Sequence, residues 1–158
     1  MEITYDHIMQ TITGFTGSIG FAILFNIRGK KMLFASLGGL ICYIVFIAAG
    51  FITASEPTCC FFAAAAISIY SEVLARVLKT PTTTFLMTAL VPLIPGGALY
   101  RTVKFAFEGN RNAASQNGIY TMQIACALAI GIIVIASFTS ITKKIMAAKS
   151  KNPNIGAA

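Results

Sequence analysis

The sequence predicts an all-α integral membrane protein, a bundle of about five transmembrane helices in which the fourth helix is broken. Three observations lead to this prediction. Hydrophobic residues make up 56% of the 158-residue chain and charged residues only 11%, whereas soluble domains carry about 25% charge. Several apolar runs reach about 20 residues, the length of helix that crosses a bilayer. The fourth run contains the sequence PLIPGG at 92–97, and its two prolines each remove a helical hydrogen-bond donor.

The apolar runs are the predicted spans, taken in chain order. Their approximate bounds are 8–27, 32–55, 58–78, 82–107 and 117–141. The first run follows an acidic amino terminus that lacks the positive charge of a secretory signal, so we expect it to be retained as a span. The second and fifth runs are uncharged, and the third contains Glu72 and Arg76. We therefore expect one transmembrane domain over 1–148 and a disordered polar tail over 149–158.

Lysine and arginine favour the cytoplasmic side of short loops and so predict the orientation. They follow the first, third and fifth spans, as Arg28, Lys30, Lys31, Arg76, Lys79, Lys143, Lys144, Lys149 and Lys151. Five spans then place the amino terminus outside and the carboxyl terminus in the cytoplasm, in the cell (inner or plasma) membrane. Arg101, Lys104 and Arg111 are the exception, because they fall on the outer side. We expect Arg101 and Lys104 to face a cavity from the second half of the broken helix; the alternatives are headgroup anchoring or a different span count.

Small residues recur at the spacing of helix–helix contacts. They are Gly14, Ser18 and Ala22 in the first span, Ala35 and Gly39 in the second, 63–66 in the third, and Ala127 with Gly131 in the fifth. Such residues let helices approach closely in a lipid environment. The pattern predicts a compact bundle with room for a surface that binds a partner.

The break at 92–97 is the strongest indication of function. In bilayer hydrocarbon, unpaired backbone groups are tolerated only where they line a protein cavity. The broken helices of transporters turn backbone groups and half-helix ends toward a solute. A simple packing kink is the alternative, since proline and glycine are common in transmembrane helices.

Two charged residues of the third span are a second candidate for function. Glu72 and Arg76 are four residues apart and therefore lie on one helix face. Arg76 is close enough to the cytoplasmic end to extend toward the headgroups, whereas Glu72 lies about 10 Å from that end. Glu72 is either half of a tolerated ion pair or a carboxylate that takes up protons. Asn26, at the end of the first span, is a candidate helix cap or ligand.

Several other functional classes are disfavoured. The chain has one histidine, and its four cysteines lack the spacing of a metal site. The motifs HExxH and GxSxG and a Walker loop are all missing from the sequence. The net charge of +7 comes from residues at the edges of apolar runs rather than from a basic patch with interleaved aromatics. We therefore expect no catalytic residues, no metal, no cofactor and no nucleic-acid partner, and the chain is not expected to be an enzyme.

Several segments together resemble the threonine/serine exporter family, specifically its small split subunit, which is similar to the carboxy-terminal half of the full-length exporters. The matching segments are GFAILFN at 20–26, LGGL at 37–40, EVLAR at 72–76, KTP at 79–81 and VPLIPGGALY at 91–100, in this order over about residues 14–108. The resemblance implies a proton-coupled exporter of threonine and serine that works with a larger membrane subunit. Related split systems export dicarboxylates such as succinate.

The residues and the resemblance together give a candidate site. Substrate contacts are expected from Pro92, Pro95, Gly96, Gly97, Tyr100, Arg101 and Asn26, and proton coupling from Glu72 with Arg76. A half-helix N-terminus offers free N–H groups and positive partial charge, so the segment after Pro95 can receive a substrate carboxylate. Three classes stay open: a subunit of an exporter of small amino acids or dicarboxylates, a channel-like or scaffolding membrane protein, and an accessory subunit of a membrane enzyme. A homo-oligomer is a further alternative for the assembly.

Overall fold

A computed structural model describes the backbone of residues 5–151 and the side chains from Met9 to Ile145. Within this part of the chain the fold is entirely helical, which confirms the all-α prediction. The elements are α1 (Tyr5–Leu24), α2 (Lys30–Ile52), α3 (Glu56–Val77), α4 (Thr82–Leu90), the short 3-10 helix η1 (Val91–Leu93), α5 (Gly96–Phe107) and α6 (Arg111–Lys151). The first, second, third and fifth predicted spans overlap α1, α2, α3 and α6. The fourth predicted span overlaps α4, η1 and α5.

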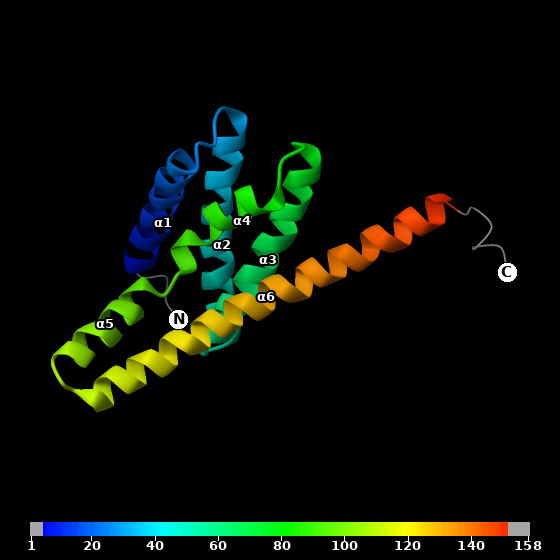
Figure 1. Cartoon of the computed structure of the whole chain (residues 1–158). Helices are drawn as coiled ribbons and strands as arrows, with labels where there is room; N and C mark the ends of the chain where they lie inside the picture. The colour runs from blue at the N-terminus through cyan, green and yellow to red at the C-terminus, as the bar shows by residue number, and fades with distance from the viewer. Residues whose placement is uncertain (1–4, 152–158) are drawn as a thin grey trace.

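The first three helices lie side by side and alternate in direction (Figure 1). α4, η1 and α5 then return the chain toward the side on which α3 begins, and α6 crosses obliquely over α3. α5 packs along the first half of α6, beside the layer of α1, α2 and α3. Consecutive membrane spans alternate in direction in the same way.

Three helices in the described part are long and apolar enough to cross a membrane, namely α2, α3 and Arg111–Ile145 of α6. The segments Thr82–Leu93 and Gly96–Phe107 give a fourth candidate, bent by 58° at the break. α1 has 20 residues, but its side chains are described only from Met9 onward, and it is not among these candidates. The structure thus supports a membrane bundle with three or four spans, and the first of the five predicted spans stays a prediction.

Small residues form the closest helix contacts, as predicted. Ser18, Ala22, Ala35, Ala63 and Ala64 are fully buried. A Cβ added to Gly39 would lie 2.0 Å from Ser18 Oγ, and a Cβ added to Gly131 would lie 2.8 Å from the carbonyl oxygen of Phe61. The helices can approach this closely only because these positions lack a side chain. The contacts hold α1 against α2 and α6 against α3.

Helix α6 is longer than the span predicted for it. Its N-terminus is capped by Asn110, whose Oδ1 accepts a hydrogen bond from the N–H of Ala113 at 3.2 Å. The helix then continues to Lys151, because the alanines and lysines after the apolar run are good helix formers even where they are too polar for a membrane. The polar tail predicted for 149–158 therefore begins within the helix, and 152–158 lie outside the described residues.

Three helices end in the same type of turn. After α1, the N–H of Ile27 donates to the carbonyl of Ala22 at 2.9 Å, which is the long bond of a Schellman motif. Asn26 occupies the left-handed position of this motif with a φ of 55°. Lys79 and Gly109, with φ values of 47° and 74°, occupy the same position after α3 and α5. The α1–α2 turn is thus fixed by backbone geometry around Asn26.

Candidate functional site

The break in the fourth span lies between Val91 and Gly96. A single 3-10 turn is followed by Ile94 in extended conformation (φ −64°, ψ 123°), and α5 begins at Gly96. Pro92 and Pro95 have no N–H and so interrupt the helical ladder. Pro95 also disfavours a helical conformation at Ile94, the residue before it. Sequence alone therefore accounts for both the position of the break and the change of direction.

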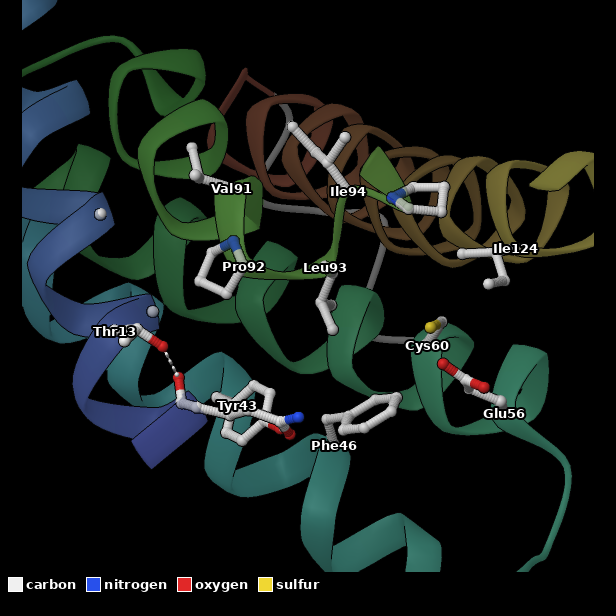
Figure 2. A pocket seen from close by; sticks show the side chains of 14 residues that line it. Thr13, Tyr43, Phe46, Glu56, Cys60, Val91, Pro92, Leu93, Ile94 and Ile124 are labelled. Atoms are coloured by element: carbon white, nitrogen blue, oxygen red, sulfur yellow. Dashed lines mark hydrogen bonds between the residues drawn. The ribbon is translucent and has the colours of Figure 1, made fainter. Parts of the chain in front are cut away.

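One side of the break borders a cavity of about 420 Å³. Its walls come from α1, α2, the start of α3, α6 and the broken segment. Figure 2 shows Pro92 and Leu93 of the broken segment on one side of it. Tyr43 and Phe46 of α2 lie opposite, and Glu56 at the start of α3 lies at one end. The volume falls within the range of small-molecule sites, about 300–1,000 Å³.

Polar side chains make up part of the cavity wall. They are Gln10, Thr13, Tyr43, Glu56 and Cys60. The hydroxyl of Tyr43 donates a hydrogen bond to Oε1 of Gln10, which ties α2 to α1. The hydroxyl of Tyr120 on α6 donates to the carboxylate of Glu56, which ties α6 to α3. Among the lining residues in the described part of the chain, Glu56 is the only charged one.

A second cavity of about 470 Å³ adjoins the first. The two share Gln10, Phe46 and Glu56, and the second extends to Thr53 and Ala54 in the α2–α3 turn. This turn is on the outer side in the predicted orientation. Glu56 therefore lies where the cavity at the break meets the space that extends toward this turn.

The structure brings only part of the predicted substrate site to the cavity. Pro92 and Pro95 line it. Gly96 and Gly97 open α5 just beyond the lining residues, and a Cβ added to Gly96 would meet nothing within 4 Å. The first turn of α5 is therefore accessible, as a site for a carboxylate requires, but it lies at the rim of the cavity.

The other predicted residues of α5 lie on its surface. Tyr100 is 69% exposed, and Arg101 Nε donates to the carbonyl of Gly97 at 3.2 Å. Lys104 Nζ lies 3.8 Å from Glu108 Oε1, and both side chains are about half exposed. Arg101 and Lys104 were expected to face a cavity, and neither lines the two cavities at the break.

Glu72 lies toward the other end of α3 from Glu56, sixteen residues or about 24 Å along the helix. Its Oε2 is 2.9 Å from Lys143 Nζ and 4.0 Å from Arg76 Nη2. Its Oε1 accepts a hydrogen bond from the hydroxyl of Thr82 at 3.3 Å. The expected pair with Arg76 is present, but Lys143 of α6 is the closer cation. Glu72 thus links α3, α4 and α6 and does not line the cavity.

Asn26 lies in the α1–α2 turn and is not a lining residue of the cavity. Its Oδ1 accepts a hydrogen bond from Arg28 Nε at 2.9 Å. Together with the left-handed backbone described above, this contact assigns the side chain to the turn. The predicted role as a cap agrees with this position better than the role as a substrate ligand.

The sequence did not identify several polar residues at the cavity wall and around Glu72 as site residues. They are Gln10, Tyr43, Glu56, Tyr120 and Lys143. A signal existed for Glu56, which is the only acidic residue between Asp6 and Glu72. Gln10 was likewise visible as a strongly polar residue inside an apolar run. No spacing rule connects Lys143 to Glu72, since 71 residues separate them.

Comparison with known proteins gives one match. A family model described as "Threonine/Serine exporter, ThrE" matches residues 10–138, most of the chain. No curated protein and no solved structure matches. The matched region contains both cavities, the break, and all of the polar residues described above except Lys143.

Proposed function

Because the chain belongs to the threonine/serine exporter family, we propose that it is one membrane subunit of a proton-coupled exporter of threonine and serine. The family is a transporter family, and the chain is a helical membrane protein of that family. The coupling to protons and a larger membrane subunit as its partner are parts of the proposal. The observation that supports it most is the cavity of about 420 Å³ beside the broken fourth span.

In this proposal the break supplies the carboxylate end of the substrate site. The N–H groups in the first turn of a helix lack partners within the helix and carry positive partial charge. In α5 that turn contains Gly96, whose N–H already donates to the carbonyl of Ile94 at 2.7 Å, and Gly97, which is the glycine proposed to donate to the substrate. The turn follows Pro95, which lines the cavity. A substrate in the cavity would therefore present its carboxylate to the start of α5.

Proton coupling is proposed for the cluster around Glu72. Two cations, Lys143 and Arg76, face this single carboxylate, whose side chain is 18% exposed. Protonation of Glu72 would release Lys143 and so loosen the contact between α3 and α6. Because the cluster does not line the cavity, coupling would act through the packing of these helices rather than through contact with the substrate.

A larger membrane subunit is proposed as the partner because α6 is poorly covered by the rest of this chain. Only 11% of its apolar window is buried, compared with 39% for α2 and α3. The resemblance to a split subunit supplies the reason for expecting a second chain.

Export of labelled solutes tests the proposal. Cells without their own exporters would be loaded with labelled threonine, serine or succinate, and would carry this chain alone, the larger family member alone, or both. We expect efflux of threonine and serine only with both chains, and its loss when an uncoupler collapses the proton gradient. Efflux of succinate alone would assign the dicarboxylate alternative. Absence of efflux with both chains inserted would contradict an exporter of these solutes, and gradient-independent, non-saturating flux would indicate a channel.

A further inference from the structure

We propose that Glu56 binds the ammonium group of the substrate, and that this contact makes the cavity selective for a zwitterionic amino acid over a dicarboxylate. The inference rests on the proposed function, because it assigns a group of the solute to a residue of the same cavity. The sequence had instead drawn attention to Glu72, as the acidic residue expected to take part in proton coupling.

The position of Glu56 fits contact with a solute. The residue lines both cavities, at the point where they meet. Tyr120 fixes the carboxylate from α6 by donating one hydrogen bond to it. A carboxylate has capacity for several further donors, so Glu56 can still accept from an ammonium group. Glu72 has no such access, because it lies about 24 Å away along α3 among Lys143, Arg76 and Thr82.

Figure 2 shows Thr13 at the other side of the cavity from Glu56, with Tyr43 and Phe46 between them. The ammonium contact is therefore assigned to Glu56, and the hydroxyl oxygens of Thr13 and Tyr43 can accept a hydrogen bond from the hydroxyl of the solute. An ammonium group has three donors and no acceptor. Its charge is opposite to that of Glu56, so one contact supplies both a hydrogen bond and an ion pair.

The same negative charge would repel a dicarboxylate. Among the described residues that line the cavity, none is a lysine or arginine, and the only charge is negative. The second carboxylate of succinate would therefore lie beside a like charge, and no lysine or arginine among these lining residues would neutralise it. An unpaired or repelled charge of this kind discriminates against the wrong ligand. The cavity thus excludes succinate through the same residue that attracts threonine.

Exchange of labelled solute in proteoliposomes that contain this chain and the larger family subunit tests the inference. The variants are Glu56→Gln, which removes the charge, and Glu56→Asp, which keeps it. Glu108→Gln is the matched control, since Glu108 is an exposed acid at the C-terminal end of α5 and is paired with Lys104. The solutes are threonine, succinate and 3-hydroxybutyrate, which is threonine without its amino group.

We expect Glu56→Gln to raise the KM for threonine roughly 10- to 100-fold, the range for loss of a hydrogen bond to a charged group. Glu56→Asp should stay close to wild type, and Glu108→Gln should match it. The KM for 3-hydroxybutyrate should not rise in Glu56→Gln, and inhibition of exchange by succinate should become stronger.

Two results would overturn the inference while leaving the exporter intact. One is an unchanged KM for threonine in Glu56→Gln. The other is an equal loss of exchange in Glu56→Asp and Glu56→Gln, which would assign Glu56 a structural role at the start of α3. Absence of threonine and serine exchange by the wild-type complex would instead overturn the proposed function itself, and the inference with it.

Discussion

Glu72 is the residue for which we propose the proton-linked role. It is a partly buried carboxylate that faces two cations from two helices. Intramembrane ionisable groups are costly, and those that persist are commonly functional. Because Glu72 links α3 to α4 and α6, a change in its charge alters the contacts between these helices.

Replacing Glu72 by Gln should separate coupling from substrate exchange. We expect Glu72→Gln to reduce gradient-driven efflux of threonine to the level seen with an uncoupler, because the variant can no longer gain or lose the proton. Exchange of threonine at zero gradient should persist, since Glu72 does not line the cavity. Efflux and exchange would be measured in the same vesicles, with Glu108→Gln as control. Uncoupler-sensitive efflux at the wild-type rate in Glu72→Gln would contradict this role.

For Asn26 we predict a structural role in the α1–α2 turn rather than a role in transport. Its φ of 55° is readily adopted by glycine and asparagine but costs a β-branched residue about 1–2 kcal/mol. Asn26→Gly should therefore keep both transport and stability, whereas Asn26→Val should lower the unfolding temperature in detergent. If Asn26 were a substrate ligand instead, Asn26→Gly would lose transport while keeping its stability. Threonine efflux and thermal unfolding of both variants distinguish these outcomes.

At the scale of helices, the close contact between α1 and α2 depends on the missing side chain of Gly39. A methyl group there would meet Ser18, with its Cβ only 2.8 Å away. Ser18 is itself fully buried, so it has little room to move, and the two helices would have to separate. Because the interior is this densely packed, an added methyl group strains the surrounding side chains and backbone.

Gly39→Ala should therefore destabilise the bundle by about 1–3 kcal/mol, the usual cost of overpacking. Gly20→Ala is the matched control on α1, because a Cβ at Gly20 meets nothing within 4 Å. We expect the control to be neutral or to stabilise the helix by up to about 1 kcal/mol. The fraction of each variant that stays monodisperse after heating in detergent measures the difference. Equal behaviour of the two variants would show that α1 and α2 are not in the contact described.

The elements were more predictable from the sequence than the sites. Apolar run length located the helices, and the two prolines located the break at Ile94, because both depend on local chemistry. The spacing of small residues predicted close helix contacts at positions such as Gly39 and Ser18, although not which helix would contact which. The pairing of Glu72 with Lys143 was not predictable in the same way, because it depends on where α6 crosses α3. Glu56 was visible as an isolated acid, but its place in a cavity depends on four helices meeting.

The whole molecule shows how far helix length and membrane thickness can differ. α6 has 41 residues, or about 60 Å at 1.5 Å per residue, while the hydrocarbon core is about 30 Å thick. The helix therefore crosses at a large tilt, extends beyond the membrane, or does both. Its first half packs against α5 on the side that is outside in the predicted orientation.

That orientation can be tested residue by residue. In a functional version without the four native cysteines, Asn110→Cys in the α5–α6 turn should react with a membrane-impermeant maleimide in intact cells. Lys144→Cys and Lys30→Cys should react only after permeabilisation, because both lie just beyond the predicted cytoplasmic ends of their membrane spans. The reverse pattern would mean that the bundle is inserted the other way round, against its lysine and arginine distribution.

An epitope at the amino terminus, scored in the same cells, decides whether α1 crosses the membrane in addition to the other four candidate spans. If α1 crosses the membrane, the epitope is accessible from outside and Lys30→Cys is not, since they flank one helix of 20 residues. If both are protected together, α1 lies on the inner surface and only four spans cross. We expect the first result, because Gly14 and Ser18 of α1 contact Pro92 and Gly39 inside the bundle. A surface helix would lose those contacts, and Gln10 would no longer line the cavity with Glu56.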